Sequence, residues 1–336
     1  MGIKTLPTLL TSSNPHDKKK EHTVIHHSED LQRLIQHMQQ VIVGKRRVLE
    51  LLVTALLSEG HVLLEDVPGI GKTLIGKTLA RCINGTFKRI QFTPDLLPSD
   101  ITGFSVFNSQ TGAFTFHPGP VMAHVLLADE INRTIPRTQS SLLESMGEFQ
   151  VTVDNLTYPL PRPFFVIATQ NPIEMDGTFP LPEAQLDRFL MRIDLGYPTI
   201  PEETSILERF QANDPLLSLS PITTPEKIVE LQQERSRVHV SSSIREYLSR
   251  LVQATRQHPS IRYGASPRAT LSLQKASQAW ALLQGRPYVI PDDVQELSGP
   301  VLLHRLILKP EERLRGITPR EVLEEVLRSV PVPLPT

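Results

Sequence analysis

The stretch HVLLEDVPGIGKTLIGKTLA, residues 61 to 80, has the pattern of a buried strand, a glycine turn and a helix. The turn DVPGIGKT almost matches the phosphate-binding pattern G-x-x-x-x-G-K-[ST], but Asp66 stands where the first glycine is expected. In such a loop, backbone N–H groups and the N-terminus of the following helix face negative phosphate. The stretch therefore indicates a nucleotide site, although an ordinary glycine turn between a strand and a helix has a similar pattern.

The loop predicts a chemical part for each of its polar residues. Lys72 would reach the β- and γ-phosphates of a nucleotide, and the Thr73 hydroxyl would bind Mg²⁺. Gly69 and Gly71 would let the backbone approach the phosphates closely. The residues expected to bind the nucleotide here are Pro68, Gly69, Ile70, Gly71, Lys72, Thr73 and Leu74.

A second candidate element is HVLLADEINR, residues 124 to 133, an apolar strand that ends in two acids. Mg²⁺ requires oxygen ligands, and Asp129 would bind it directly or through water. Hydrolysis requires a group that polarises the attacking water, and Glu130 would do so. The alternative is a strand end whose acids face solvent, which the apolar character of the strand argues against.

A third candidate element is FFVIATQNP, residues 164 to 172, another apolar strand, which ends in Thr169, Gln170 and Asn171. The amide of Asn171 could orient the water between the γ-phosphate and Glu130. An ordinary polar strand exit before a proline explains the same residues equally well.

Short apolar runs alternate with helical stretches as far as Pro198. The runs are HVLLE (61–65), FKRIQF (87–92), HVLLAD (124–129), FFVIAT (164–169) and RIDLGY (192–197). Continuous apolar runs of this length predict strands of a parallel sheet that is buried on both faces, and the alternation predicts an α/β fold. After Pro198 the strands stop, and the remaining periodic stretches predict a helical domain.

Composition limits the classes of function. The chain has 336 residues, of which 21% are charged and 39% hydrophobic, and its net charge is −1. This length suggests two domains, and the near-neutral charge gives no overall attraction to nucleic acid or to an anionic membrane. The single cysteine, Cys82, excludes a disulfide within the sequence and favours a cytoplasmic setting. No apolar run approaches the ~20 residues of a membrane-spanning helix.

Domain boundaries follow from the same patterns. Residues 1–28 are rich in lysine and histidine, contain little to bury and lack the apolar segment of a signal peptide, so they are predicted to be a disordered tail. The α/β domain is predicted over residues 29–198 and the helical domain over residues 199–330. The proline-rich residues 331–336 are predicted to form a second tail.

A family resemblance rests on four segments in a fixed order. EDVPGIGKT, LLADEINRTIPRTQSSLLESMGE, VIATQNPIEMDGTFPLPEAQLDRFLMRI and GASPRA resemble the MoxR family of AAA+ ATPases, in the helix-2-insert clade. The resemblance covers about residues 31 to 330, and many loops of this family carry the EDVPG variant. It implies a P-loop αβα parallel-sheet domain followed by a smaller all-α lid domain, with ATP and Mg²⁺ as cofactors.

The resemblance also implies roles for single residues. The positions that match Walker A, Walker B and sensor 1 are, in that order, Lys72 with Thr73, Asp129 with Glu130, and Asn171. Arg188, in EAQLDRF, matches the arginine finger that reaches the γ-phosphate of the neighbouring subunit, and such a finger contributes ~10³–10⁵ in rate. Without the resemblance, Arg188 would be read as the partner of Asp187 or as a surface ion pair.

Three further positions take roles from the resemblance. Arg268, in GASPRA, matches sensor 2 at the start of a lid helix, and whether it acts within its own subunit or on a neighbour stays open. Val43 and Gly44, in VIVGK, match the segment that lines the adenine pocket. Arg133 is either an intersubunit contact or part of a structural ion pair.

Two stretches resemble family insertions. DITGFSVFNSQTGAFTFHPGP (100–120) and QVTVDNLTYPLPRPF (150–164) have the alternation and turn residues of hairpins. Both are expected on the axial surface of a ring. The phenylalanines of the first stretch would either contact a client protein there or pack across the strands of the hairpin; they are Phe104, Phe107, Phe114 and Phe116.

The resemblance predicts Mg²⁺-dependent ATP hydrolysis by a homo-oligomeric ring, usually a hexamer, that remodels or matures partner proteins. The clients of this family often carry von Willebrand factor A domains. One alternative is a nucleotide-gated assembly scaffold with little turnover, which an intact Glu130 and Arg188 argue against. Another is a nucleic-acid remodelling ATPase, which the near-neutral charge argues against. Neither nucleic acid nor direct membrane insertion is expected.

Overall fold

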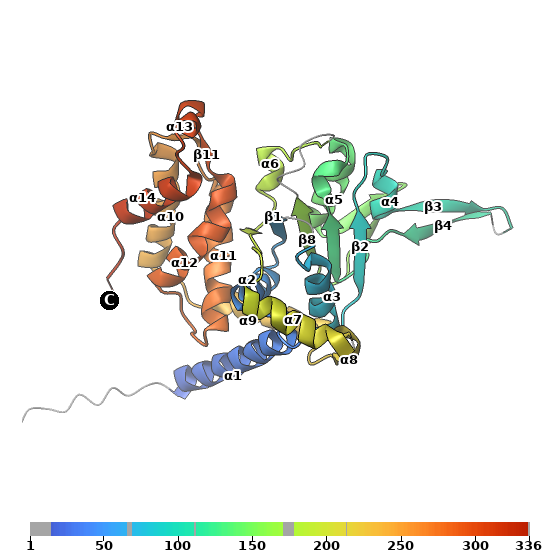
Figure 1. The fold of residues 1–336 in the computed structure, drawn as a ribbon, viewed down its shortest axis with the longest axis horizontal. Coiled ribbons are helices and arrows are strands. Elements are labelled where there is room, and N and C mark those ends of the chain that lie inside the picture. Colours follow the sequence, from blue (N-terminus) through green and yellow to red (C-terminus); the bar gives the residue numbers. More distant parts are fainter. Residues whose placement is uncertain (1–14, 66–68, 111, 171–177, 213, 335–336) are drawn as a thin grey trace, which may run out of the picture.

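A five-stranded sheet lies at the centre of the first half of the chain (Figure 1). Its strands run parallel in the order β2-β5-β8-β1-β9. They are β1 (Val62–Glu65), β2 (Phe87–Gln91), β5 (Val125–Asp129), β8 (Phe165–Gln170) and β9 (Met191–Ile193). The computed structural model describes residues 15–65, 69–110, 112–170, 178–212 and 214–334. Because all strands point the same way, their carboxyl ends meet at one edge, where open α/β sheets bind ligands.

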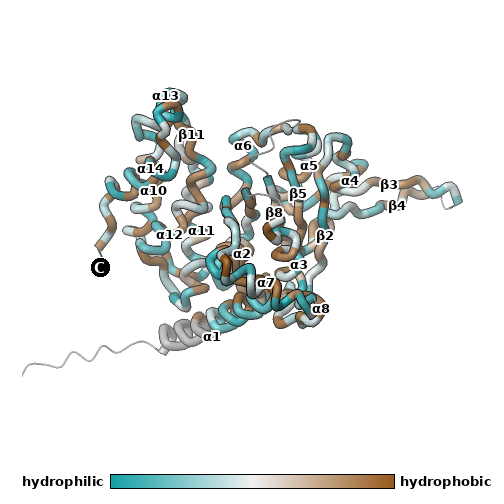
Figure 2. The backbone as a smooth tube through the Cα atoms, viewed as in Figure 1, coloured by the Kyte–Doolittle hydropathy of each residue, from teal (hydrophilic) through white to brown (hydrophobic). Residues whose placement is uncertain are grey.

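The inner strands send alternate side chains into two apolar cores, since successive residues face opposite sides of a sheet. Leu127 belongs to the larger core and Leu126 to the smaller one, and Figure 2 shows apolar residues along β5. The helices of the larger core include α1 (Pro15–Met38), α2 (Arg46–Leu57) and α3 (Lys72–Cys82). Those of the smaller core include α4 (Pro98–Thr102) and α5 (Pro136–Glu148). The parallel α/β layer predicted from the sequence is confirmed.

Strand β2 corrects one expectation. It pairs only with β5, so it is the edge of the sheet, and Ile90 is its one buried side chain. The prediction that FKRIQF is buried on both faces is therefore wrong. The polar residues of this strand, Lys88, Arg89 and Gln91, are exposed, and two of them reach the candidate site.

Strand β9 corrects a second expectation. It spans Met191–Ile193, whereas the sequence predicted a strand over 192–197. The chain leaves the sheet after Ile193. Beyond it, the Nζ of Lys45 donates to the carbonyls of Gly196 (3.0 Å) and Tyr197 (2.9 Å). Those carbonyls are thus satisfied by a side chain instead of a sheet partner.

Helix α1 begins at Pro15, so the prediction of a disordered tail is wrong for residues 15–28, while residues 1–14 lie outside the described residues. Ser28 Oγ donates to the carbonyl of Leu283 at 2.9 Å, and the His27 side chain is buried. These tertiary contacts hold a segment whose hydrophilic composition predicts solvation.

Helices follow the sheet, as predicted, in two groups (Figure 1). The first group lies near α1–α3 and comprises α7 (Ile200–Ala212), α8 (Pro215–Ser218) and α9 (Pro225–Arg237). The second group lies beside the sheet and comprises α10 (Ser242–Gln257), α11 (Pro267–Leu283), α12 (Pro291–Leu302), α13 (Pro310–Leu314) and α14 (Pro319–Ser329). The larger apolar core continues from the sheet into α10–α12. A domain boundary at residue 198 stays a prediction.

The helical region also contains a short sheet that the sequence did not predict. β10 (Ile261–Tyr263) and β11 (Ile307–Leu308) pair antiparallel, and the 3₁₀ helix η2 (Leu303–Arg305) precedes β11. Strands of two or three residues are too short to show a period of two. Within the described ranges, no helix has the length and apolar character needed to cross a bilayer.

Both predicted hairpins are confirmed. The first joins β3 (Gly103–Asn108) to β4 (Ala113–Pro118), and it projects from the sheet domain in Figure 1. The second joins β6 (Gln150–Val153) to β7 (Leu156–Pro159) through the two residues Asp154 and Asn155. Both turn residues have positive φ (49° and 64°), which is the geometry that two-residue hairpin loops require.

The buried imidazole of His61 predicts a pH dependence of stability. Its Nδ1 accepts from the backbone N–H of Val166 (3.1 Å), its Nε2 lies 3.1 Å from the carbonyl of Met146, and burial lowers its pKa to about 4. Between pH 6.5 and 4 the unfolded chain binds a proton that the folded chain does not, so stability falls as pH drops through this window. We expect His61 to account for a loss of about 2 kcal/mol in the free energy of unfolding between pH 7 and pH 5.

Urea unfolding at both pH values, for the natural chain and for His61→Gln, measures this share. The variant should lose about 2 kcal/mol less than the natural chain over the same pH interval. Equal losses in the two proteins would show that His61 does not carry the effect.

Candidate nucleotide site

The N-terminus of α3 follows directly from the glycine turn after β1. Gly71 has φ 91° and is the N-cap of α3, and Lys72 is the first residue of the helix. A Cβ at Gly71 would meet nothing within 4 Å, so the glycine is required there by its positive φ and not by crowding. Thr73 follows in the first turn, where helix N–H groups are unpaired and favour an anion. Pro68 lies outside the described residues.

The last residue of β1, Glu65, brings a negative charge close to this turn. It lies 3.2 Å from the guanidinium of Arg192, which lowers the pKa of its carboxyl, but partial burial has the larger effect and raises that pKa. The charge of Glu65 is therefore partly compensated by Arg192 at the end of β1.

Asp129 ends β5 and is held from both neighbouring strands. Its Oδ1 accepts from Thr169 Oγ1 of β8 at 2.6 Å. Its Oδ2 accepts from the Nη2 of Arg89 on β2 at 2.7 Å. The carboxylate is thus oriented on both sides and does not point freely into solvent, so the simple strand-end alternative does not describe it.

Glu130 follows with the backbone in the left-handed region, at φ 58° and ψ 51°. Such a conformation is uncommon outside glycine and is concentrated at functional sites. Its N–H donates to Thr169 Oγ1 (2.8 Å), so one hydroxyl orients both acids. Its Oε2 accepts from Gln91 Nε2 at 2.7 Å and lies 3.1 Å from Arg133 Nε. Two polar groups, from Gln91 and Arg133, therefore fix the orientation of the Glu130 carboxylate.

The sequence left two roles for Arg133, an intersubunit contact or a structural ion pair. In the structure, Arg133 forms an ion pair with Glu130 of the same chain. The pair is half-exposed, with 40% and 22% of the two side chains accessible. Exposed pairs contribute little to stability, so the pair matters here chiefly for the orientation of Glu130.

The oxygen donors at this edge fit Mg²⁺. The Thr73 hydroxyl and the Asp129 carboxylate are hard oxygen ligands, which Mg²⁺ prefers. Asp129 Oδ2 accepts two bonds, from Nε and Nη2 of Arg89, whereas Oδ1 accepts one, from Thr169. A carboxylate oxygen can accept two bonds, so Oδ1 retains capacity for a metal or a metal-bound water. Held by these two residues, Mg²⁺ would supply positive charge that offsets the charge of the phosphates.

Strand β8 brings its polar end to the same edge as Asp129. Thr169 is fully buried and Gln170 is the last residue of the strand. Asn171, predicted as the sensor of the γ-phosphate, lies outside the described residues, so its role stays a prediction.

The turn before α2 contains the residues predicted for the adenine pocket. Gly44 has φ 64°, and a Cβ there would come within 1.8 Å of the Glu202 carboxylate in α7. Val43 is partly buried beside it. A larger residue at position 44 would only have to move the flexible end of the Glu202 side chain, so the glycine is favoured there chiefly by its positive φ. The adenine role of the turn stays a prediction.

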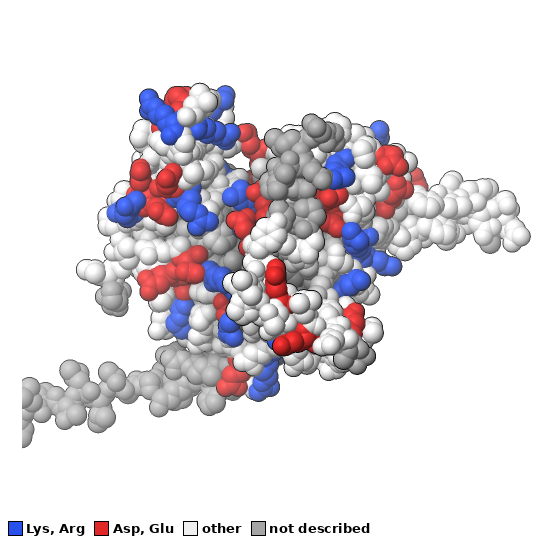
Figure 3. Space-filling model, viewed as in Figure 1, with Lys and Arg blue, Asp and Glu red and all other residues white. Residues whose placement is uncertain are grey.

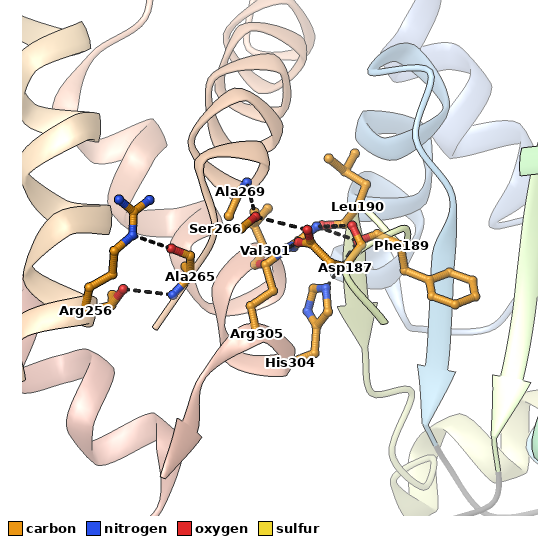
Figure 4. Close-up of polar contacts among 11 residues, drawn as sticks. Asp187, Phe189, Leu190, Arg256, Ala265, Ser266, Ala269, Val301, His304 and Arg305 are labelled. Atoms are coloured by element: carbon orange, nitrogen blue, oxygen red, sulfur yellow. Dashed lines mark hydrogen bonds and ion pairs between the residues drawn. The ribbon is translucent and has the colours of Figure 1, made fainter. Parts of the chain in front are cut away.

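The segments that carry the two predicted arginines meet at Asp187, which accepts from Ser266 Oγ at the start of α11. Arg188 follows α6 (Glu183–Leu186), is exposed, and donates from Nη1 to the carbonyl of Leu143. Arg268 is exposed in the first turn of α11. Burial lowers the pKa of the Arg305 guanidinium most, and the charge of Arg268 lowers it further. The Asp187 carboxylate is bound by Arg305 and not by Arg188 (Figure 4).

Sequence reasoning missed the residues that orient the two acids. Arg89 and Gln91 are two apart on β2 and therefore face the same side of the sheet, next to Asp129 and Glu130. The sequence FKRIQF (87–92) could have indicated them, because polar residues interrupt an apolar run there. That interruption is typical of an edge strand, where polar side chains remain available for a site.

Comparisons with known proteins agree with this arrangement. A family profile described as "ATPase family associated with various cellular activities (AAA)" matches residues 61–191, and one described as "AAA lid domain" matches residues 253–326. The chain is 51% identical over 312 residues to the protein YeaC of Bacillus subtilis (strain 168), a match that covers 92% of this chain and 98% of YeaC.

Two further comparisons cover nearly the whole chain. The chain is 44% identical over 312 residues to Chaperone MoxR1 of Mycobacterium tuberculosis, covering 90% of this chain and 82% of that protein. Its fold matches a crystal structure from Cytophaga hutchinsonii with a TM-score of 0.89 and 39% identity, covering 96% of this chain and all (100%) of that one.

The hydroxyl of Thr169 predicts a specific effect on metal affinity. Thr169→Val keeps the shape of the buried side chain but removes the donor to Asp129 Oδ1 and the acceptor for the Glu130 N–H. Loss of a group that orients a ligand typically costs 10–100-fold in metal affinity. We expect the Mg²⁺ concentration for half-maximal ATP hydrolysis to rise by about that factor.

The matched control is Thr152→Val, which removes a hydroxyl that bonds only to Thr157 on the β6–β7 hairpin. It should leave the Mg²⁺ dependence unchanged. An unchanged Mg²⁺ titration for Thr169→Val would show that Asp129 does not depend on this hydroxyl for metal binding.

Proposed function

The chain belongs to the MoxR family of AAA ATPases, and from this membership we propose that it hydrolyses ATP with Mg²⁺ at the carboxyl edge of its parallel sheet. The observation that carries the proposal is the paired arrangement of Asp129 and Glu130 around the single hydroxyl of Thr169. It would set a metal ligand and a base side by side at the end of β5, and the Thr169 hydroxyl that contacts both lies on β8, the neighbour of the strand β1 that leads into the phosphate-binding turn.

In the proposed reaction, the turn and the α3 N-terminus bind the phosphates. Lys72 neutralises the β- and γ-phosphates, and Thr73 and Asp129 hold Mg²⁺. Glu130 polarises the water that attacks the γ-phosphate, and Asn171 orients that water. Gln91 and Arg133 hold the Glu130 carboxylate, so it acts as a base only after these contacts rearrange around the water.

We further propose that each site is completed by a neighbouring subunit of a homo-oligomeric ring, in the cytoplasm and usually hexameric in this family. Arg188 and Arg268 emerge from one joint between lid and sheet domain, which supports their action on the same nucleotide. Arg188 would stabilise the charge on the transferring phosphoryl group, as arginine fingers do.

A protein client is the proposed target of the ATP-driven motion, as a MoxR-type chaperone. The relative MoxR1 is named a chaperone. Residues 103–118 contain no Asp, Glu, Lys or Arg, and Figure 3 shows the β3–β4 arm without charge. Phe107 and Phe114 pack on each other with ring centroids 5.3 Å apart, yet remain 55% and 72% exposed. The rings therefore pack across the strands and still present an apolar surface, which supports the proposal that an apolar segment of a client binds there.

Replacing Glu130 tests the hydrolysis mechanism. Glu130→Gln keeps the size of the side chain but removes the base, so turnover should fall ~10²–10⁴-fold while ATP binding persists. Glu144→Gln, at an exposed glutamate of α5, is the matched control and should hydrolyse ATP normally. Turnover is measured as phosphate release and binding as ATP-dependent fluorescence or calorimetric titration. If Glu130→Gln hydrolyses ATP at the natural rate, the assignment of Glu130 is wrong.

The dependence of rate on protein concentration tests the ring. A site completed by a neighbour predicts an ATPase rate per subunit that rises with protein concentration and then levels off, because assembly is concentration-dependent. A measurable rate that stays constant from dilute to concentrated protein, together with monomers in sedimentation, would contradict a shared site. A rate that equals the Glu130→Gln blank at every concentration would favour the scaffold alternative.

A further inference from the structure

The guanidinium of Arg305 is saturated by the segment that carries Arg188. Only 3% of the Arg305 side chain is accessible. Its Nε donates to Asp187 Oδ1 (2.6 Å), and its Nη2 donates to the carbonyls of Asp187 (3.2 Å) and Phe189 (2.7 Å). Its Nη1 donates to the carbonyls of Leu190 (3.2 Å) and Val301. An arginine has five N–H donors, so every donor is used, and four of the five bonds reach residues 187–190.

These bonds surround Arg188 without touching it. Asp187 precedes it, and the carbonyls of Phe189 and Leu190 follow it (Figure 4). The Phe189 ring is completely buried in the smaller core, and the Phe189 carbonyl also lies 3.2 Å from His304 Nε2. The backbone on both sides of Arg188 is thus anchored, while the Arg188 side chain itself stays exposed.

His304 adds to the anchor as a neutral donor. Burial lowers the pKa of its imidazole well below the ordinary value, and the adjacent Arg305 charge lowers it further. A neutral imidazole with its proton on Nε2 donates to the Phe189 carbonyl without adding a second buried charge. The contact between residues 304–305 and residues 187–190, here called the joint, therefore contains one ion pair, Arg305 with Asp187, and hydrogen bonds to neutral acceptors.

The same carboxylate reaches the helix that carries Arg268. Asp187 Oδ2 accepts from Ser266 Oγ at 3.0 Å. Ser266 is the N-cap of α11, where its Oγ accepts from the N–H of Ala269 at 3.3 Å. Asp187 therefore connects the finger segment, η2 and the first turn of α11, in which Arg268 lies.

We propose that Arg305 and Asp187 form a latch from the lid that positions Arg188, and with it Arg268, for action on the nucleotide of a neighbouring subunit. This inference rests on the proposed function of Arg188 as a finger acting between subunits. Arg305 is a positioning residue, because its bonds go to the residues that flank Arg188 and not to the nucleotide. A lysine cannot replace it, since an ammonium offers a point charge and three donors where the latch uses a planar fork of five.

The first test replaces Arg305 by lysine, which retains the charge that compensates Asp187. Displacement of a catalytic group by about 1 Å can reduce the rate ~10²-fold, so kcat should fall by about that factor with the KM for ATP unchanged. The matched control is Arg286→Lys, because Arg286 also pairs with a buried lid carboxylate, Asp293, and makes no contact with residues 187–190. Arg286→Lys should hydrolyse ATP at the natural rate; a natural kcat for Arg305→Lys would overturn the proposal.

Mixing two inactive variants separates positioning from a general loss of structure. Lys72→Ala lacks a working phosphate loop but keeps its finger, and Arg188→Ala lacks the finger but keeps its loop. In a head-to-tail ring, an equal mixture places an intact loop opposite an intact finger at about one interface in four. An equal mixture of Lys72→Ala and Arg305→Lys should recover activity to the same extent, because the defect of Arg305→Lys also lies in the arginine that it offers its neighbour.

The outcomes separate the latch from the intersubunit finger on which it rests. Recovery with Arg188→Ala but not with Arg305→Lys would overturn the latch and leave the proposed function intact. Recovery in neither mixture would overturn the intersubunit finger itself. Should Arg305→Lys fail to assemble, Asp187→Asn removes the charge of the latch with little change of shape and should give the same loss of kcat and the same recovery with Lys72→Ala. Normal turnover of Asp187→Asn would overturn the latch.

Discussion

The parallel pairing of β5 with β2 on one side and with β8 on the other is the constraint on which the candidate site depends. It places Asp129 opposite Gln91 in register and brings the buried Thr169 hydroxyl beneath both acids. Two adjacent carboxylates at one strand end would repel each other and be solvated. Here Asp129 accepts from Thr169 and Arg89, and Glu130 accepts from Gln91. Donors to a charged acceptor are the stronger class of hydrogen bond, so the sheet holds the two carboxylates side by side in fixed orientations.

The edge position of β2 has a functional consequence. A strand with one free side usually needs charged side chains to prevent pairing with another chain, and Arg89 meets that need. The same strand uses Arg89 and Gln91, on one face, to bind the acids of its neighbour. Arg89 Nη2 also donates to Gln91 Oε1 at 2.7 Å, so the two groups are coupled. Asp129 and Glu130, the proposed metal ligand and base, are thereby connected through a chain of three side-chain hydrogen bonds.

Much of this could be predicted from local sequence, and the failures share a cause. The strands β1, β5 and β8 and both hairpins depend on short-range patterns, and each is present within a residue or two of its predicted bounds or inside them. The helix through residues 15–28 depends on docking against α11, more than 250 positions away in the case of Ser28 and Leu283 (|i−j| = 255). Arg305 bonds to Asp187 across 118 positions, and no periodicity in either segment indicates the pair. The missed elements are those in which tertiary contact overrides local composition.

The two halves of the proposed site lie on parts of the chain that differ in how they are held. The phosphate half depends on the sheet, whose register allows little adjustment. The arginine half depends on a joint in which one buried guanidinium satisfies five acceptors. Rotation of the lid away from this arrangement would leave buried N–H and C=O groups unpaired, each at about 1–3 kcal/mol. The lid and the finger segment are therefore expected to move as one body, so a nucleotide that shifts the lid would also shift the arginines offered to the next subunit. The apolar core that runs from the sheet into α10–α12 limits that shift to motions that keep the core packed.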